Sequence, residues 1–288
     1  MIEFNIELIN TGGQLLSSRS TKQIDLLSQL NRSSSHFFLL SETRKSIATP
    51  NSGPGYRKKV NDLLKKWTAI TEGGGGLLST TGQTGILWKS LSSTNIRVEE
   101  IPHQHNQKRI TDIYIYMDNY KLRLTSVYAP TTDKQVSEKF FPKLIEEFSS
   151  NETANTPWAI GGDWNCVLDP SLDQTSHTTV DPPQTLRCLQ EFLLRHSLAD
   201  SYRSFYPKKR AYTNQASASP SKRRLDRLYV NPPLIGMLRK VKIGDRPHPD
   251  THHQYTCVFA DKLLESGPGT WKGKNSLLSN KAHCTRIY

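Results

Sequence analysis

Short apolar runs alternate with segments of helical periodicity along this chain, and the alternation narrows the choice of fold more than any other property. Strand-like runs bounded by turn residues include 2–10 and 158–161, whereas apolar residues at helical spacing cover 22–30 and 183–196. Asp118-Asn119 also separates two strand-like runs by a short turn, as in a hairpin. Because helices interleave with strands and hairpins occur as well, the pattern predicts an α/β fold, with two mixed β-sheets packed face to face and helices outside.

Length and composition set the size of the structure and exclude some classes of protein. The 288 residues, of which 35% are hydrophobic, suffice for a sizeable core. We expect one domain over residues 1–262 and a poorly ordered tail over 263–288, where the sequence becomes rich in Gly, Lys and Asn. Residues 73–76 are all glycine and predict a flexible loop. An apolar run of about 18 residues, which a membrane span needs, is absent from the sequence, and so is a signal peptide, so we expect an intracellular protein.

The chain carries an excess of positive charge. Its 38 Lys and Arg residues outnumber the 26 Asp and Glu residues, which gives a formal net charge of +12. Such an excess attracts a polyanion, most simply a nucleic acid. A basic surface can also serve solubility alone, so the charge by itself leaves both interpretations open.

Polar residues recur where the predicted strands end: Asn10, Glu42, Asp163, Asn165 and Asp226. Each has a simple structural explanation, such as a turn or a surface charge, and Asp226 could form an ion pair with Arg224 or Arg227. Sheets gather the side chains at their strand ends into one cleft. Several such residues in a strongly basic protein therefore favour a functional site.

The chemistry of these side chains suits the hydrolysis of a phosphodiester. Carboxylate oxygens such as those of Glu42 suit Mg²⁺, which binds through one or two carboxylates and substrate phosphate. An aspartate such as Asp163 can take the proton from an attacking water, and a histidine can serve as acid, base or cationic clamp. His252 and His253 are adjacent, a spacing that seldom binds one ion, and the four cysteines form no C-x-x-C pair. We therefore expect no transition-metal site and place a histidine in the same cleft.

Gly161-Gly162-Asp163-Trp164-Asn165 resembles the GDxN signature of the endonuclease/exonuclease/phosphatase superfamily, which includes deoxyribonuclease I and the apurinic endonucleases. Further motifs follow the order of that family along the chain. Asn10 stands at its first-strand Asn, residues 39–43 resemble its LQET segment, residues 127–130 its YxP segment and residues 224–230 its RIDxIYV strand. The resemblance covers residues 1–262 and implies a DNase I-like, four-layered α/β sandwich.

A second resemblance narrows the first. Residues 163–170, followed by Leu172-Asp173, are similar to the GDFNCVLDPxLD stretch of endonucleases from non-LTR, LINE-type retrotransposons. Residues 267–278 are similar to the GPGxWKxNxSLL segment that follows those endonucleases. This implies a monomeric domain from the front of a retroelement polyprotein, with a nuclear location. A reverse transcriptase module normally comes next, and because the chain stops at Tyr288 we expect a copy that lacks it.

The family resemblance also implies how the water and the metal are held. Glu42, helped by Asn10, would hold Mg²⁺, for which Mn²⁺ can substitute. Asp163 would orient and deprotonate the attacking water, with Asn165 steadying the water and the phosphate.

On the substrate side, Tyr128 would contact the scissile phosphate and Asp226 would orient a catalytic His252. The implied substrate is duplex DNA, nicked to leave a 3′-hydroxyl that primes reverse transcription. Basic segments would supply phosphate contacts, namely residues 57–59, 208–210 and 222–224.

Two positions depart from the family pattern. The family ends with Ser/Thr-Asp-His, but here Asp250-Thr251 precedes His252, so a threonine stands where a catalytic aspartate is expected. If the fold does not compensate, a histidine without that partner would be less basic, and turnover would fall on the order of 10²- to 10⁴-fold. Alternatively, His253 is the catalytic histidine. Gly12 also replaces an Asn or Asp of the first motif, which removes an indirect metal contact. Besides a DNA endonuclease, whose activity these departures can impair, two alternatives stay open: a remnant that binds nucleic acid without cleaving it, and a phosphatase of small phosphoesters.

Overall fold

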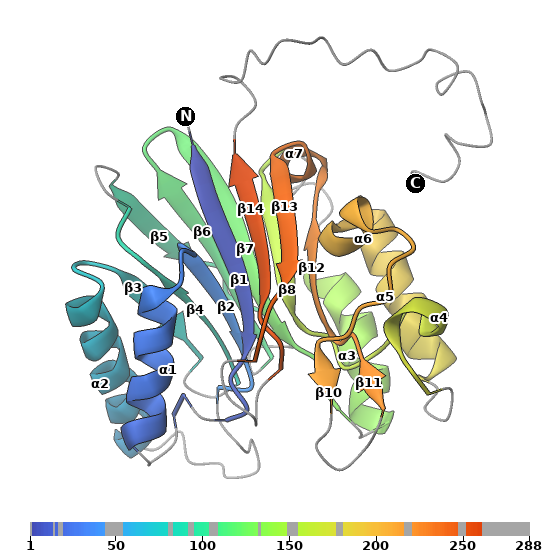
Figure 1. Cartoon of the computed structure of the whole chain (residues 1–288), viewed down its shortest axis with the longest axis horizontal. Coiled ribbons are helices and arrows are strands. Elements are labelled where there is room, and N and C mark those ends of the chain that lie inside the picture. Colours follow the sequence, from blue (N-terminus) through green and yellow to red (C-terminus); the bar gives the residue numbers. More distant parts are fainter. Residues whose placement is uncertain are drawn as a thin grey trace.

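The structure is a computed structural model. It describes residues 2–13, 15–16, 20–43, 54–79, 83–91, 95–103, 109–131, 134–148, 155–176, 181–215, 221–246 and 252–260. Two β-sheets lie face to face in the middle of the molecule, and helices cover their outer faces (Figure 1). This arrangement confirms the predicted four-layered α/β sandwich. The predicted tail and the Asp250-Thr251 positions lie outside the described residues.

The first sheet combines strands from both ends of the chain. Its strands, in spatial order, are β13 (Leu238–Ile243), β14 (Tyr255–Ala260), β1 (Glu3–Asn10), β2 (Phe37–Ser41), β4 (Thr84–Trp88) and β3 (Gly75–Leu78). The sheet is mixed, because β1 pairs in parallel with β2 while its other neighbour, β14, is antiparallel.

The second sheet has one parallel pair among antiparallel ones. Its strands, in spatial order, are β5 (Ile96–Glu100), β6 (Ile110–Met117), β7 (Tyr120–Tyr128), β8 (Trp158–Asp163), β12 (Asp226–Val230) and β9 (Ala199–Asp200). The parallel pair is β7 with β8. A separate two-stranded ribbon joins β10 (Asn214–Gln215) to β11 (Lys222–Arg223).

Two helices cover each sheet, and short helices fill the connections. They are α1 (Ser20–Arg32), α2 (Pro54–Ile70), α3 (Lys134–Glu147), α4 (Pro170–Asp173), α5 (Pro183–Arg195), α6 (Ser201–Phe205) and α7 (Pro232–Ile235). Leu30 of α1 and Trp67 of α2 share a buried cluster with Phe38 on the outer face of the first sheet. Phe192 of α5 packs with Trp158 on the outer face of the second. Among the described residues, no helix is long and apolar enough to cross a membrane.

The glycine run of residues 73–76 is only partly a loop, which corrects the sequence-based prediction. Gly75 and Gly76 belong to β3 and pair with Trp88 and Leu87 of β4. A Cβ atom added at Gly75 would lie 2.6 Å from the Trp88 ring, a distance that real side chains do not tolerate. Here glycine serves close packing of a strand under an indole ring rather than flexibility.

Polar bonds join the two sheets close to the end where the strands finish. Thr84 Oγ1 and Thr111 Oγ1 lie 2.8 Å apart across the interface. Ser126 Oγ donates to the carbonyl of Leu40 at 2.8 Å. Buried hydroxyls need such partners, and these contacts fix how the rims of the two sheets face each other.

Candidate active site

The candidate residues lie where strands of both sheets end at one rim. Asn10 is the last residue of β1 and Glu42 follows β2, whereas Tyr128 and Asp163 end the neighbouring parallel strands β7 and β8. Asp226 begins β12 and lies directly opposite Asp163 in the antiparallel pair. The fold therefore brings residues from distant parts of the sequence to one edge.

Strand alternation points these side chains into the gap between the sheets. Leu8 of β1 and Leu228 of β12 belong to the core between the sheets, and because side chains alternate, Asn10 and Asp226 share their inward direction. Asn10 Nδ2 donates to Asp163 Oδ2 at 2.9 Å, so this hydrogen bond crosses from the first sheet to the second.

Asp163 is the centre of the cluster and has only 2% of its surface exposed. Its Oδ1 accepts the backbone N–H of Asn165 at 3.0 Å, and its Oδ2 accepts from Asn10. Burial and the facing carboxylate of Asp226 raise the pKa of Asp163 well above the usual range, although His252 and the two hydrogen bonds oppose them. A carboxylate with a raised pKa can act as a base near neutral pH.

His252 is the histidine that faces this cluster. Its Nδ1 lies 2.7 Å from Asp226 Oδ2 and 3.8 Å from Asp163 Oδ2. Burial favours the neutral ring, but the carboxylates of Asp226, Asp163 and Glu42 outweigh it and raise the pKa of His252 to about 9. The loss of basicity expected from Thr251 is therefore not seen, because Asp226 supplies the charge that partners the imidazolium.

His253 points elsewhere. Its Nδ1 lies 2.8 Å from the carbonyl of Gly244, and its backbone N–H donates to the carbonyl of Thr213 at 2.8 Å. The ring is thus engaged on the edge of the first sheet, and the geometry favours His252 as the histidine of the cluster.

The structure does not show the ion pair of Asp226 with Arg224 or Arg227 that the sequence left possible. Arg224 instead binds Asp173 at 2.8 Å and Asp200 at 2.7 Å. Arg227 donates to the hydroxyl of Tyr229 at 3.1 Å and to the carbonyl of Cys166. Both guanidinium groups are buried and lie away from the face that Asp226 shares with Asp163.

The loop after β1 holds the backbone around Glu42. Thr11 Oγ1 and Gly13 N both donate to the carbonyl of Glu42, at 2.7 Å each. Asn10 Oδ1 accepts the N–H of Gly12 at 2.9 Å, an Asx-type turn, and Gly12 has a φ of +54°. Gly12 thus supplies left-handed backbone, which glycine adopts without strain.

Two candidate residues adopt the left-handed conformation that residues other than glycine rarely adopt. Glu42 has a φ of +52° and Asn165 a φ of +48°. Asn165 is held there by its Nδ2, which donates to the carbonyl of Ala129 at 2.7 Å. Gly162 precedes Asp163 with a φ of +140°, and a Cβ there would lie 2.0 Å from the carbonyl oxygen of Val127. Such strain gathers at functional sites, where the surrounding structure imposes it.

Arg109, which the sequence did not single out, contacts Tyr128. The Arg109 guanidinium donates to the carbonyl of Tyr128 at 3.2 Å and lies 5.7 Å from the centre of its ring. Burial lowers the pKa of Arg109, and burial together with Glu42 and Asp163 raises that of Tyr128. In the sequence Arg109 is one basic residue before an ordinary strand, so its place beside the cluster is visible only in three dimensions.

The donor set suits a hard divalent cation. Possible ligand atoms of Asp163, Asp226 and His252 lie within 4.8 Å of one another, but because His252 is held as an imidazolium, the oxygens of this rim are the ligands open to a metal. Asp226 Oδ1 is buried and has no hydrogen-bond partner among the described residues. Glu42 raises the pKa of His252 and of Tyr128, which places its charge close by. Carboxylate and amide oxygens are the ligands that Mg²⁺ prefers.

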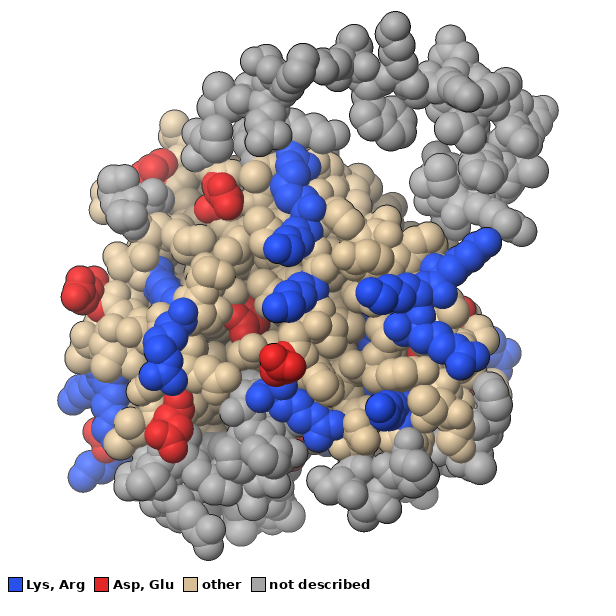
Figure 2. All heavy atoms as spheres, in the orientation of Figure 1, with Lys and Arg blue, Asp and Glu red and all other residues tan. Residues whose placement is uncertain are grey.

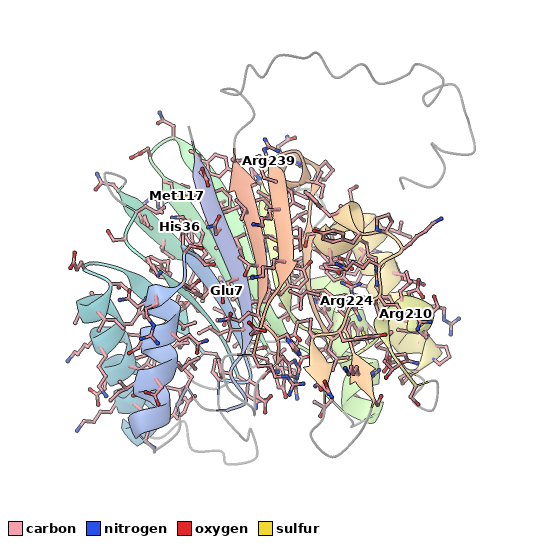
Figure 3. The ribbon with its side chains drawn as sticks, in the orientation of Figure 1. Glu7, His36, Met117, Arg210, Arg224 and Arg239 are labelled. Carbon is pink, nitrogen blue, oxygen red and sulfur yellow. The ribbon has the colours of Figure 1, made fainter. Side chains whose placement is uncertain are left out.

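The predicted basic segments differ in what they can contact. Residues 57–59 and 208–210 are exposed, whereas Arg224 of the third segment is buried in its ion pairs. Figure 3 shows Arg224 in the interior between β12 and the neighbouring helices, and Arg210 at the outer side of the molecule. The prediction that Arg224 contacts phosphate is therefore wrong, and its role is structural.

Several solved structures share this architecture, and two of them are endonucleases by name. The AP endonuclease LMAP from Leishmania major superposes with a TM-score of 0.69 at 13% identity, over 90% of this chain and 88% of that one. The endonuclease domain of TRAS1, a telomere-specific non-LTR retrotransposon, gives 0.60 at 11% identity over 90% and 98%. The catalytic domain of Xenopus laevis APE2 gives 0.62 at 22% identity over 88% and 90%. No known family model and no curated protein sequence matches the chain. The chain thus shares the DNase I-like α/β sandwich fold of these structures.

Proposed function

We propose that this chain is a phosphodiesterase that depends on a divalent metal and nicks DNA to leave a 3′-hydroxyl. The observation that carries the proposal is the placement of Asp163. It is buried, lies opposite Asp226 and has a raised pKa. Like charges directly opposite each other in a sheet are destabilising, so a fold that keeps them together does so for chemistry.

In the proposed reaction each residue has a defined task. Asp163 takes a proton from the attacking water at a carboxylate oxygen, and the bond from that water to phosphorus forms as the bond to the 3′-oxygen breaks. His252, held as an imidazolium by Asp226, gives a proton to the leaving 3′-oxygen. Tyr128 and Arg109 lie beside the phosphate and support its negative charge.

The proposed metal is Mg²⁺, with Mn²⁺ as a substitute. Glu42 and Asn10 would hold it, and a divalent cation there neutralises charge that develops on the phosphate. Asn10 has a second task that needs no metal, because its amide fixes Asp163 Oδ2 from the opposite sheet.

Charge supports a nucleic acid as the substrate. The net charge is +12, and on the face shown in Figure 2 lysine and arginine side chains are widely spread while acidic ones are few. Exposed cations contact phosphate without reading sequence. Together with the retrotransposon-like motifs around Asp163, this favours DNA over a small phosphoester. A retroelement origin and a reverse transcriptase module in the parent polyprotein are part of the same proposal.

A nicking assay tests the proposal. Supercoiled plasmid is incubated with Mg²⁺ and with wild type, Asp163→Asn, or Asp62→Asn, a matched change on the exposed side of α2. We expect nicking by wild type and Asp62→Asn and its loss in Asp163→Asn. A polymerase should then extend the nicks without prior end repair, since they carry a 3′-hydroxyl.

Each alternative function gives a different result. Retention of the plasmid on a gel without nicking would indicate a protein that binds DNA but does not cleave it. Phosphate release from a small ester, in the absence of nicking, would indicate a phosphatase. Nicking that survives in Asp163→Asn would contradict the assignment of the base.

A further inference from the structure

We propose that Asn214 is a positioning residue for His252, whose side-chain amide fixes the imidazole plane and keeps Nε2 turned toward the cleft. The proposal rests on the proposed phosphodiesterase function, but the contact itself can be measured in the absence of substrate.

Both ring nitrogens of His252 are contacted. Nδ1 lies 2.7 Å from Asp226 Oδ2, and Nε2 lies 2.6 Å from Asn214 Nδ2. A ring held at Nδ1 alone can tilt about that bond, whereas a second contact on its opposite side removes this freedom. Because Asp226 occupies Nδ1, a phosphate or a leaving oxygen would approach the ring on its Nε2 side, where it would share this nitrogen with the Asn214 amide. Asn214 therefore controls the reactive side of the imidazole.

Thr213, next to Asn214, is hydrogen-bonded to Asp226 and to His253, the residue after His252. Thr213 Oγ1 accepts the backbone N–H of Asp226 at 3.0 Å, and the Thr213 carbonyl accepts the N–H of His253 at 2.8 Å. The N–H of Thr213 donates to the carbonyl of Arg223 at 2.9 Å, which anchors the start of β10 to β11. These bonds do not use the Asn214 side chain, so the contact with His252 is the polar task left to its amide.

A carboxamide suits a ring that exchanges a proton. Its NH₂ group can donate to a neutral Nε2, and its carbonyl can accept from Nε2–H once the ring is protonated. A half-turn of the amide exchanges the two ends. Asn214 can thus stay bound while His252 loses and regains its proton, whereas aspartate would serve only the protonated ring and leucine would serve neither form.

The kinetic test compares Asn214→Leu, which keeps the size and removes both polar ends, with Asn214→Asp, which keeps an acceptor. Gln215→Met, at the exposed neighbour on the same strand, is the control. We expect Asn214→Leu to lower kcat for nicking about 10- to 100-fold, as lost supporting contacts do, and to change KM less than about threefold. Asn214→Asp should recover most of kcat but raise KM, since a carboxylate repels DNA phosphates. Gln215→Met should match wild type.

A spectroscopic test needs neither metal nor DNA. The ¹⁵N resonance of His252 Nε2 should move in Asn214→Leu and stay in place in Gln215→Met, with thermal unfolding of each variant measured alongside. Asn214→Ser gives the same readouts if the leucine variant does not fold. A wild-type kcat in Asn214→Leu, or an unmoved Nε2 resonance, overturns the positioning role. If the resonance moves in Asn214→Leu but the wild-type protein nicks no DNA, the contact is supported and the proposed function is overturned instead.

Discussion

Replacing Asp226 by asparagine separates charge from orientation at His252. The asparagine carbonyl can still accept the Nδ1–H that now reaches Asp226 Oδ2 at 2.7 Å, so the ring keeps a partner. What is lost is the negative charge. Burial alone would lower the pKa of His252, and the first of the opposing contributions comes from Asp226, followed by those of Asp163 and Glu42. We therefore expect a neutral ring at neutral pH in Asp226→Asn.

The structure gives the size of the effect. The pKa of His252 is about 9, against an ordinary value of 6.5. At about 1.4 kcal/mol per pKa unit, the imidazolium contributes on the order of 3 kcal/mol to the free energy of unfolding. This contribution is complete below the ordinary pKa and is lost as the pH rises through the raised one. Wild-type stability should thus fall between about pH 7 and pH 10, and Asp226→Asn should lose most of that dependence.

The assay is urea unfolding at a series of pH values, combined with plasmid nicking. Asp226→Asn should nick on the order of 10²- to 10⁴-fold more slowly, since it loses an acid–base partner. The change also removes the carboxylate that raises the pKa of Asp163, so the proposed base becomes weaker as well. The reasoning is refuted if wild-type stability is flat across that pH range, or if both proteins show the same slope.

Three further outcomes are expected. In wild type, Mg²⁺ at about 100 times its dissociation constant should raise the free energy of unfolding by about 3 kcal/mol. Glu42→Gln should reduce this gain. An equal gain in both proteins would contradict the assignment of Glu42 to the metal. Thr213→Val should lower the free energy of unfolding by about 1–3 kcal/mol in urea titrations, because two buried backbone N–H groups lose their acceptor; an unchanged midpoint would show that they find another. Arg224→Met should cost about 3–5 kcal/mol of stability, because it removes the buried guanidinium that Asp173 and Asp200 share. Lys209→Ala should leave stability unchanged but lower the slope of DNA affinity against salt by about 1. The reverse pattern would place Arg224 on the DNA-binding surface.

Much of the fold could be predicted because the responsible signals are local. Alternation of apolar residues predicts the strands. The same alternation predicts whether the last residue of a strand points toward the core between the sheets. Asn10 continues the inward series of β1, and Asp226 that of β12. Once two sheets face each other, residues at neighbouring strand ends must meet. The order of the motifs along the chain added the expectation that Glu42 and Asp163 lie at the same rim.

The rest depends on contacts between segments far apart in the sequence. Arg224 looks like a cation beside Asp226, but its partners Asp173 and Asp200 come from other parts of the chain. Nothing local distinguishes His252 from its neighbour His253, and only the approach of β12 selects one. Asn214 has no sequence feature that marks it, because its contact with His252 exists only once the ribbon of β10 and β11 lies against the segment that leads into β14.

The position of β14 determines when the first sheet can be completed during folding. The strand lies beside β1, with Glu3 opposite Ala260, and it begins at Tyr255, shortly after His252. During synthesis one edge of β1 stays unpaired until residue 260 has left the ribosome. Pairings between such remote segments form slowly, and unpaired edges invite aggregation in the meantime. His252 precedes the strand that closes the sheet, so it joins Asp163 and Asp226 only after most of the described chain has been synthesised.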